Sequence, residues 1–376
     1  MTNGSQKRRA RAASAHRAAP GETQRTGVQT LAVEASEAGM RLDRWFKRRF
    51  PDLALSHLAR ILRKGEVRVD GKRAETSTRI EEGQAIRVPP LTLAAPAAPA
   101  VRRASPEDAE AIRRMTLFED KHVLVLDKPF GLAVQGGSGT KHHIDGMLAA
   151  LASEKGERPL LVHRLDRDTS GVLLIAKSRR MAAELGEIFR SRRARKIYWA
   201  LVEGVPKPAQ GRISLYLAKG ESMGAARRPR AAGDRQIAME KMRVAKHGED
   251  DAQHSLTYYA IVDKVAPRCA WLSMKPLTGR THQLRAHAEA IGHPIFGDPK
   301  YGHRPEDDVR RRDPLRAMPD GLDRKLHLLA RRLVLPHPAG GVIDVTAPLP
   351  EHMRRTWDTF GFDAKAYDPI EEAPEE

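Results

Sequence analysis

The pattern of apolar residues changes character along the chain. In the first quarter, apolar residues recur three or four positions apart in two sets, which predicts two short amphipathic helices: Leu42, Trp45 and Phe46, then Leu58, Ile61 and Leu62. An alternating Val-x-Val stretch then runs into Asp70-Gly71, a pair typical of a two-residue hairpin turn. Residues 28–90 therefore predict a compact module of two helices and short strands.

From residue 111 onward the pattern favours strands. Five apolar stretches have strand length: Val123 to Leu126, Val172 to Ala176, Ile197 to Val202, Leu256 to Val262 and Ala270 to Met274. Residues 281–290 have helical spacing, whereas residues 219–250 and 302–325 are charged and poorly periodic, so we expect long loops or insertions there. The predicted fold class is α+β, with a small module followed by a larger mixed α/β domain whose sheet is mainly antiparallel.

Composition sets the boundaries between these parts. Residues 1–27 carry six basic residues, one acid and few large apolar groups, so we expect a disordered basic tail. Residues 91–110 are rich in Pro and Ala and predict a semi-rigid linker. The second domain is expected over residues 111–366, and residues 367–376, which are mostly acidic, are expected to be a solvated tail.

Charge and cysteine content narrow the function. The 376 residues include 66 Lys plus Arg and 48 Asp plus Glu, a net charge of +18. This charge indicates a polyanionic partner such as nucleic acid, or about equally a generally basic enzyme. The single cysteine, Cys269, excludes an internal disulfide framework and a Cys-based metal site, and it fits a reducing cytoplasm. No apolar run approaches the ~18 residues of a membrane span. We therefore expect a cytoplasmic protein with no membrane partner.

A basic cluster lies at the end of the second predicted helix and on the strand after it. It comprises Arg60, Arg63, Lys64 and Arg68, with Lys72 and Arg73 next to them. Such a cluster suits RNA phosphates, although charge runs are more often solvated surface. A helix-turn-helix DNA reader is less favoured, because the second helix leads into a basic hairpin instead of a third packing helix.

The most informative segment is His163-Arg-Leu-Asp-Arg-Asp-Thr-Ser-Gly171, a charged loop that leads into an apolar strand. Asp166 and Asp168 alternate with arginines, and a carboxylate beside guanidinium groups stays ionised at neutral pH. Asp166 is thus a candidate nucleophile or base, and the alternative is a salt-bridged turn. A glycosidase-like pair of carboxylates is also open, because the sequence does not give the separation of Asp166 and Asp168.

Three motifs in this chain resemble those of the RluA-type pseudouridine synthases. They are the charged loop above, Arg195-Lys-Ile-Tyr-Trp-Ala-Leu-Val202, and Lys275-Pro-Leu-Thr-Gly-Arg-Thr-His-Gln-Leu-Arg-Ala-His287 with Gly292-His-Pro-Ile-Phe-Gly-Asp-Pro-Lys-Tyr-Gly302. Residues 40–88 resemble the S4 RNA-binding domain. Together these resemblances cover about residues 40–350. Within the family, the basic hairpin and Ala133-Val-Gln-Gly-Gly-Ser-Gly139 look most like the members of the C type, which act on large-subunit (23S) ribosomal RNA.

The resemblance implies a role for each matching residue. Asp166 matches the essential aspartate, which attacks C1′ of the ribose or C6 of the uracil, or starts glycal formation. Arg285 matches the arginine that pairs with this carboxylate, and Tyr198 matches the tyrosine that stacks on the base. Arg164 matches the residue that enters the stack vacated by the flipped nucleotide. His163, Arg280 and His282 support the motifs, with structural or RNA-contact roles.

The predicted function is the isomerisation of specific uridines of large-subunit ribosomal RNA to pseudouridine, on free RNA or an assembling particle. No cofactor or metal is implied, and we expect a monomer. Two alternatives stay open: a ribosome-assembly factor that binds RNA with an idle catalytic domain, and the same chemistry on another RNA. Residues 219–255 are longer and more irregular than the family pattern, which puts the choice of uridines in doubt.

Overall fold

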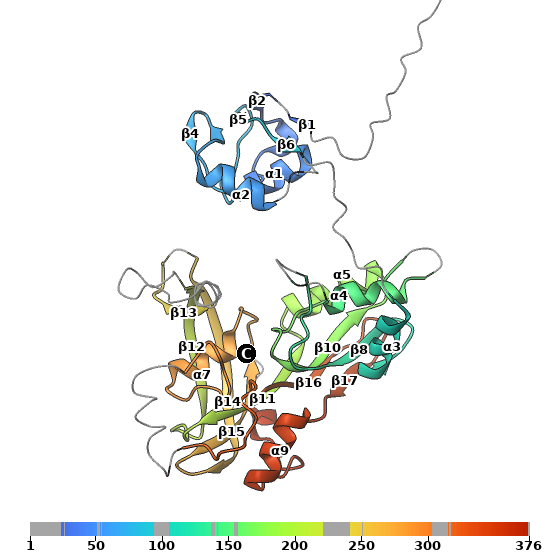
Figure 1. Cartoon of the computed structure of the whole chain (residues 1–376), viewed down its shortest axis with the longest axis vertical. Coiled ribbons are helices and arrows are strands. Elements are labelled where there is room, and N and C mark those ends of the chain that lie inside the picture. Colours follow the sequence, from blue (N-terminus) through green and yellow to red (C-terminus); the bar gives the residue numbers. More distant parts are fainter. Residues whose placement is uncertain are drawn as a thin grey trace, which may run out of the picture. The chain divides into compact units, whose positions relative to one another are not determined.

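The computed structural model divides into two compact units, Met1–Val101 and Arg102–Glu376 (Figure 1). The residues that it describes are 24–25, 27–50, 53, 55–93, 105–136, 140, 142–153, 157–220, 241–249, 251–302, 315 and 317–374. Within this part of the chain, no helix is long and apolar enough to span a membrane.

The first unit packs two helices against a small antiparallel sheet. The helices are α1 (Leu42–Arg49) and α2 (Leu55–Arg63), preceded by a 3-10 turn, η1 (Ala35–Glu37). The sheet has the order β2 (Gln29–Ala32), β5 (Ala85–Val88), β3 (Arg68–Val69) and β4 (Lys72–Arg73). The apolar residues that predicted the helices form its core, since all six of them are buried there. The predicted helices are confirmed.

The predicted hairpin turn lies between β3 and β4. Asp70 and Gly71 both have positive φ angles, 48° and 72°, as a two-residue type I′ turn requires. This turn directs the basic ends of β3 and β4 to the same edge of the sheet, where Arg68 pairs with Arg73 in register.

Two expected boundaries of this unit are corrected. Within the tail expected over residues 1–27, Gln24–Arg25 form a strand, β1, that pairs with β6 (Thr92–Leu93), inside the expected linker. The linker also ends before residue 110, because helix α3 spans Pro106–Met115. The side chain of Ser105 caps this helix by accepting from the Asp108 amide, and the Asp108 carboxylate accepts from the Ser105 amide. Residues 1–23 and 94–104 lie outside the described part.

The second unit is built on one eleven-stranded sheet. Nine strands follow the order β13 (Met242–Ala245), β12 (Gln210–Lys219), β14 (Gln253–Val265), β15 (Cys269–Pro276), β11 (Arg195–Glu203), β16 (Leu328–Pro336), β10 (Ser170–Ala176), β8 (Val123–Lys128) and β7 (Thr116–Glu119). In addition, β17 (Val342–Thr346) pairs with β16, and β9 (Leu160–Leu161) pairs with β10. Among the strands of the described residues, β10 and β16 are the one parallel pair, so the expected mixed, mainly antiparallel sheet is confirmed.

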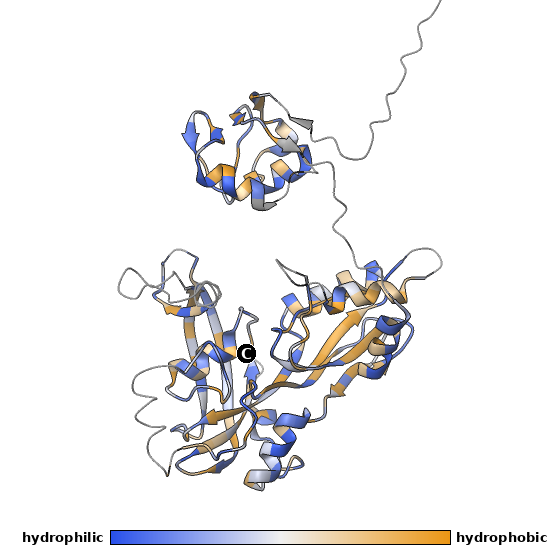
Figure 2. Cartoon of the chain, viewed as in Figure 1, coloured by the Kyte–Doolittle hydropathy of each residue, from blue (hydrophilic) through white to orange (hydrophobic). Residues whose placement is uncertain are grey.

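Helices cover both faces of this sheet around its centre. Strand β10 is buried along its whole length: Val172 and Leu174 face a core formed with α5 (Arg179–Arg190) and α9 (Glu351–Phe360). Leu173 and Ile175 face the opposite core, formed with α3, α4 (Ile144–Met147) and the 3-10 turn η2 (Leu148–Leu151). Figure 2 shows β8 and β10 as largely hydrophobic strands, as burial on both faces requires. Helix α7 (Gln283–Ala290) packs on the other half of the sheet, against residues of β11 and β15.

Two expected irregular segments contain ordered structure. The insertion expected over 219–250 includes strand β13, which pairs with β12 at the edge of the sheet. The solvated tail expected over 367–376 is also wrong for its first half, because Pro369–Glu372 form a 3-10 turn, η3, with Ile370 buried. Asp368 fixes this segment by accepting hydrogen bonds from Trp199 and Ser273. Residues 221–240 and 303–314, in the two expected insertions, lie outside the described residues.

Candidate active site

The three residues expected to perform the chemistry line one cavity of about 580 Å³ in the second unit. Asp166 lies in the loop before β10, Tyr198 lies on β11, and Arg285 lies on α7. Four other expected residues also line this cavity: His163, Arg164, Arg280 and His282. The fold thus collects residues from all three motifs at one place.

A buried lysine, Lys128, stabilises the loop that carries Asp166 by hydrogen bonds to backbone carbonyls. The ammonium group of Lys128 donates to the carbonyls of Pro129, Leu132 and Arg167, each at 2.9 Å. Burial lowers the pKa of Lys128 to about 7, although the carboxylates of Asp168 and Asp166 oppose this shift. Lys128 was not among the predicted site residues; the available signal was a lysine that follows Asp127 at the end of the apolar run Val123 to Leu126.

Glycine at position 171 allows this loop to enter the sheet. Its φ is 107°, and a Cβ atom there would lie 2.2 Å from the carbonyl oxygen of Ala330 on the parallel neighbour β16. Any side chain would therefore push β10 away from β16 and displace the loop that carries Asp166.

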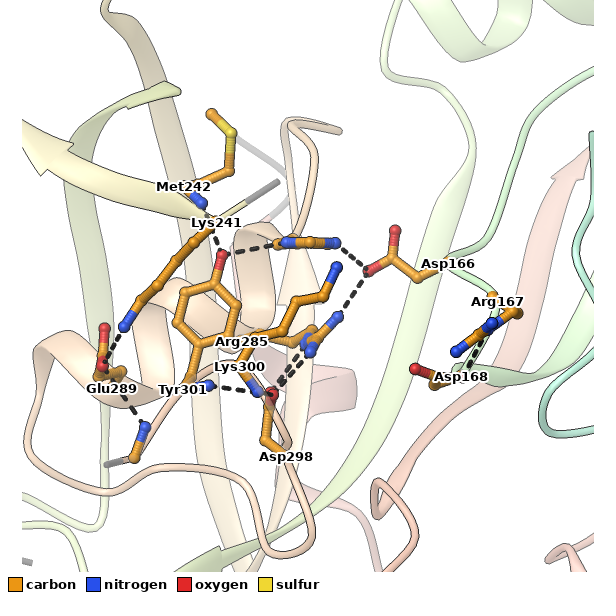
Figure 3. A network of polar contacts seen from close by, with 12 residues as sticks. Asp166, Arg167, Asp168, Lys241, Met242, Arg285, Glu289, Asp298, Lys300 and Tyr301 are labelled. Atoms are coloured by element: carbon orange, nitrogen blue, oxygen red, sulfur yellow. Dashed lines mark hydrogen bonds and ion pairs between the residues drawn. The ribbon is translucent and has the colours of Figure 1, made fainter. Parts of the chain in front are cut away.

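Arg285 lies between two carboxylates (Figure 3). Its Nε and Nη2 atoms donate to Asp298 at 2.7 and 2.6 Å, and its Nη1 atom lies 3.7 Å from Oδ2 of Asp166. Burial alone would lower the pKa of Arg285, but the paired Asp298 and the nearby Asp166 raise it, so the guanidinium stays charged. Asp298 lies in the third motif, but no role was predicted for it.

His282 approaches Asp166 from the same side. Its Nε2 atom lies 3.8 Å from Oδ2 of Asp166, and its Nδ1 atom lies 3.1 Å from the hydroxyl of Tyr301. That hydroxyl accepts from the backbone amide of Met242 on β13, so its own proton is assigned to Nδ1 of His282. The ring proton then lies on Nε2, facing Asp166. Burial lowers the pKa of His282, which keeps the ring neutral.

Tyr198 and Trp199 point to opposite faces of β11, as predicted for neighbours on a strand. Tyr198 lines the cavity, whereas Trp199 lies in the core on the other face, where its indole donates to Asp368 at 2.9 Å. Burial raises the pKa of Tyr198, and the charge of Asp166 raises it further. Tyr198 is therefore a neutral phenol on the cavity side of the strand.

The supporting residues of the motifs have different surroundings. His163 is partly buried, accepts a hydrogen bond from the Leu174 amide at 2.9 Å and stacks on Phe189. Desolvation lowers its pKa to about 3, so it is a neutral structural residue. Arg280 lies at the exposed edge of the cavity and donates to the carbonyl of His254. Arg164 is exposed and also lines the cavity.

Arg285 faces Asp166, as the resemblance implied, whereas the neighbouring Arg167 pairs with Asp168 instead. Arg167 contacts Asp168 at 3.2 Å and is exposed, and Figure 3 shows this pair apart from Arg285 and Asp298. The guanidinium that faces Asp166 belongs to Arg285, far along the chain. Asp168 does not line the cavity, so the geometry gives no support to a glycosidase-like pair of carboxylates.

The basic cluster of the first unit is exposed as expected. Arg60, Arg63, Lys64 and Arg68 all have exposed side chains at the end of α2 and on β3. Arg73 donates to the carbonyl of Arg63 at 2.8 Å, which ties β4 to the end of α2. The cluster is available to a polyanion, and binding by it stays a prediction.

The expectation that the protein needs neither a metal nor a cofactor also stays a prediction. Among the residues that the structure describes, no three His, Cys, Asp or Glu side chains are grouped so that they could hold a metal ion.

Comparisons with known proteins agree on one family. The RNA pseudouridylate synthase family matches residues 122–290. Over 337 residues, 89% of this chain and 97% of the relative, the sequence is 36% identical to ribosomal large subunit pseudouridine synthase C of Escherichia coli (strain K12). It is 34% identical to the protein of the same name from Vibrio vulnificus (strain CMCP6), over 88% of this chain and 96% of that protein. Among solved structures, human RNA pseudouridylate synthase domain containing 4 is similar, with 30% identity and a TM-score of 0.52 over 66% of this chain and 94% of that one.

Proposed function

The chain belongs to the RNA pseudouridylate synthase family, and we propose that it converts uridines of large-subunit (23S) ribosomal RNA to pseudouridine, with Asp166 as the essential carboxylate. The observation that carries the proposal is the approach of Arg285 and His282 to one oxygen of Asp166 inside a cavity of nucleotide size. The names of the relatives support the choice of RNA.

The reaction exchanges one bond for another. The bond between N1 of uracil and C1′ of ribose breaks, the base rotates, and a bond forms between C5 and C1′. The proton on C5 leaves and N1 gains a proton, so atoms and electrons balance without a redox partner. An isomerisation of this kind needs a positioned carboxylate and a closed space for the base more than it needs an external reactant.

The residues around the cavity have different roles in this reaction. Arg285 orients Asp166, because its guanidinium is itself fixed by Asp298. Tyr198 offers the detached uracil an aromatic face and a phenol for the late transfer of the C5 proton. Arg164, exposed at the cavity, enters the RNA stack when the target nucleotide flips out.

An RNA-binding assembly factor with an idle domain is the second candidate, and the site argues against it. Arg285 and Asp298 are both buried and charged, and burying an ion pair costs several kcal/mol of desolvation that its attraction only roughly offsets. A domain that only binds RNA has no use for a buried ion pair that adds little stability. A catalytic carboxylate, in contrast, needs a guanidinium held in a fixed position.

We assign the first unit to RNA binding, on its resemblance to an S4 domain and its exposed basic cluster. We also propose that the protein acts as a monomer in the cytoplasm, on free ribosomal RNA or an assembling particle. The buried single thiol of Cys269 is compatible with a reducing compartment.

The experiment that tests the target offers the full-length protein three unmodified RNAs: large-subunit ribosomal RNA, small-subunit ribosomal RNA and a transfer RNA pool. Each is then digested, and pseudouridine is measured by mass spectrometry. We expect pseudouridine in the large-subunit RNA alone. Product only in transfer RNA would contradict the target, and no product in any RNA, with tight binding retained, would favour the idle binding protein.

A further inference from the structure

A run of basic residues joins α5 to β11, and its members differ in how they are partnered. Arg190 pairs with Glu187 at 2.7 Å and Arg195 pairs with Glu371 at 2.7 Å. Arg193 donates to the hydroxyl of Ser191. In contrast, the side chains of Arg192 and Lys196 have no ion pair or hydrogen bond within the part of the chain that the structure describes. Both of them line the cavity that contains Asp166.

Lys196 is held in the wall of the cavity. It lies two residues before Tyr198 on β11, on the same face of the strand, since Ile197 and Trp199 both enter the core behind it. Burial lowers the pKa of the Lys196 ammonium to about 8, and the charge of Arg192 lowers it further. The exposed Arg192 and the partly buried Lys196 therefore repel each other at the cavity, which costs energy in the free protein.

Arg192 carries a second cost. Its φ is 60°, the left-handed conformation, at the point where α5 ends and the Arg193 amide bonds back to the carbonyl of Ile188. Glycine is the favoured residue at this position of a helix, and a side chain there costs on the order of 1 kcal/mol. The chain thus keeps a strained arginine where glycine would be more stable, and its side chain lines the cavity.

We propose that Arg192 and Lys196 form a binding subsite for a phosphodiester of the RNA backbone next to the target nucleotide. This inference rests on the proposed function, because it takes the cavity to hold a uridine. Two converging cations call for an anion, and the phosphodiester is the anionic group that RNA carries.

The position of the subsite explains why a phosphate is the ligand rather than the base. Asp166 must reach the ribose or the uracil, and Tyr198 stacks on the uracil, so the nucleoside lies beside these two residues. Lys196 lies one strand repeat from Tyr198, on the order of 7 Å along β11. That places it beside the chain that leads away from the flipped nucleotide, where contacts with phosphates fix register and orientation.

The test uses the full-length protein and the variants Lys196→Met and Arg192→Gly, with unmodified large-subunit ribosomal RNA as the probe. We expect each variant to lower the slope of log K against log salt concentration by about 0.7–0.9, the loss of one phosphate contact. The affinity should fall more than the single-turnover rate at saturating RNA, because the contact forms in the ground state as well as in the transition state.

Stability separates this role from a structural one. Arg192→Gly relieves the left-handed strain, and Lys196→Met removes a partly buried charge that Arg192 repels, so both variants should melt at or above the wild-type temperature. Weaker binding by a protein of equal or greater stability is not the result of misfolding. The matched control is Arg193→Gln, which removes a charge of the same run away from the cavity and should keep the wild-type slope.

Three results would overturn the proposal. They are an unchanged salt slope in both variants, an equal drop in Arg193→Gln, and a hundredfold slower rate at saturation with unchanged affinity, which would make Lys196 a proton-transfer group. Binding is measured without turnover, so failure of the proposed function is distinguishable. In that case wild-type protein would bind the RNA with its full salt slope and form no pseudouridine.

Discussion

Arg285 donates two parallel hydrogen bonds to Asp298, at 2.7 and 2.6 Å, and both side chains are buried. Asp298 is itself fixed, because its Oδ1 atom also accepts from the backbone amides of Lys300 and Tyr301. The third nitrogen of the guanidinium is then left facing Asp166. Asp298 is thus the positioning residue for the charge that orients the proposed catalytic carboxylate (Figure 3).

Replacing Asp298 with Asn should therefore damage both stability and turnover. The change leaves Arg285 buried without its charge partner, which costs about 3–5 kcal/mol of unfolding free energy. The rate at saturating RNA should fall more than the affinity, because Arg285 no longer holds Asp166 in place. Urea unfolding and single-turnover pseudouridine formation measure the two effects.

Asp344→Asn is the matched control for that change. Asp344 accepts two hydrogen bonds from Arg332 with the same geometry, at 2.7 and 2.6 Å. This pair, however, is partly exposed on the β16–β17 hairpin. Loss of this ion pair should lower the unfolding free energy by at most about 1 kcal/mol and leave turnover unchanged. Equal effects of the two substitutions would contradict a special role for Asp298.

The C-terminal segment supports the strand that carries Tyr198. Asp368 accepts from the indole of Trp199 at 2.9 Å and from the hydroxyl of Ser273 at 2.7 Å. We expect Asp368→Ala to lower the unfolding free energy by about 1–3 kcal/mol for each buried donor left unsatisfied, and to slow turnover by loosening β11. Glu372→Gln, which removes only an exposed contact with Tyr367, should leave both unchanged. Wild-type stability in Asp368→Ala would refute this support.

The stability of the second unit should fall as the solution becomes acidic. Burial lowers the pKa of His163 to about 3, and it lowers those of His287 and His327 to about 4. In the unfolded chain these histidines therefore bind protons near pH 6.5, whereas in the folded chain they stay neutral at that pH. Stability is complete above that pH and decreases as the pH falls toward 4, by at most about 1.4 kcal/mol per pH unit for each histidine.

Comparison with His163→Gln isolates one of these histidines. Glutamine keeps an acceptor for the Leu174 amide but does not titrate. Asp127, whose pKa burial raises to about 6, acts in the opposite direction in both proteins and cancels in the difference. Denaturant unfolding between pH 7 and 5.5 should show a shallower pH dependence in the variant. Identical slopes would mean that His163 is charged in the folded state.

The basic cluster of the first unit should carry a separate part of the RNA affinity. Changing Arg60, Arg63, Lys64 and Arg68 together to Gln should lower the salt slope by up to about 3.6, since each phosphate contact contributes about 0.7–0.9. All four side chains are exposed, so the melting temperature should not change. An unaltered slope would mean that the basic cluster of this unit does not bind RNA phosphates.

Local sequence signals predicted the parts of the fold that depend on local pattern. The Asp70-Gly71 turn, strand β10 and helix α7 follow from turn chemistry and apolar spacing, which the neighbouring residues determine. The convergence of Asp166, Tyr198 and Arg285 came from the resemblance to a family, because no periodicity specifies which distant segments meet.

Several of the missed features depend on contacts between distant parts of the chain. Asp368 looked like a solvated acid until Trp199, 169 residues away, supplied a buried donor. Strand β13 lies in a charged, irregular stretch, yet its pairing with β12 brings the Met242 amide to Tyr301, next to His282. Likewise, nothing in the sequence marks Arg192 as left-handed, because arginine rarely adopts that conformation.

The central claim is that Asp166 drives the exchange of the bond at N1 for a bond at C5. The most direct measurement is release of tritium from C5-labelled, unmodified large-subunit ribosomal RNA, with wild-type protein and Asp166→Asn in parallel. The C5 hydrogen must leave when C5 becomes the glycosidic carbon. We predict release by the wild type and none by Asp166→Asn, with RNA binding retained by both. Release by Asp166→Asn at the wild-type rate would contradict the assignment of the catalytic carboxylate.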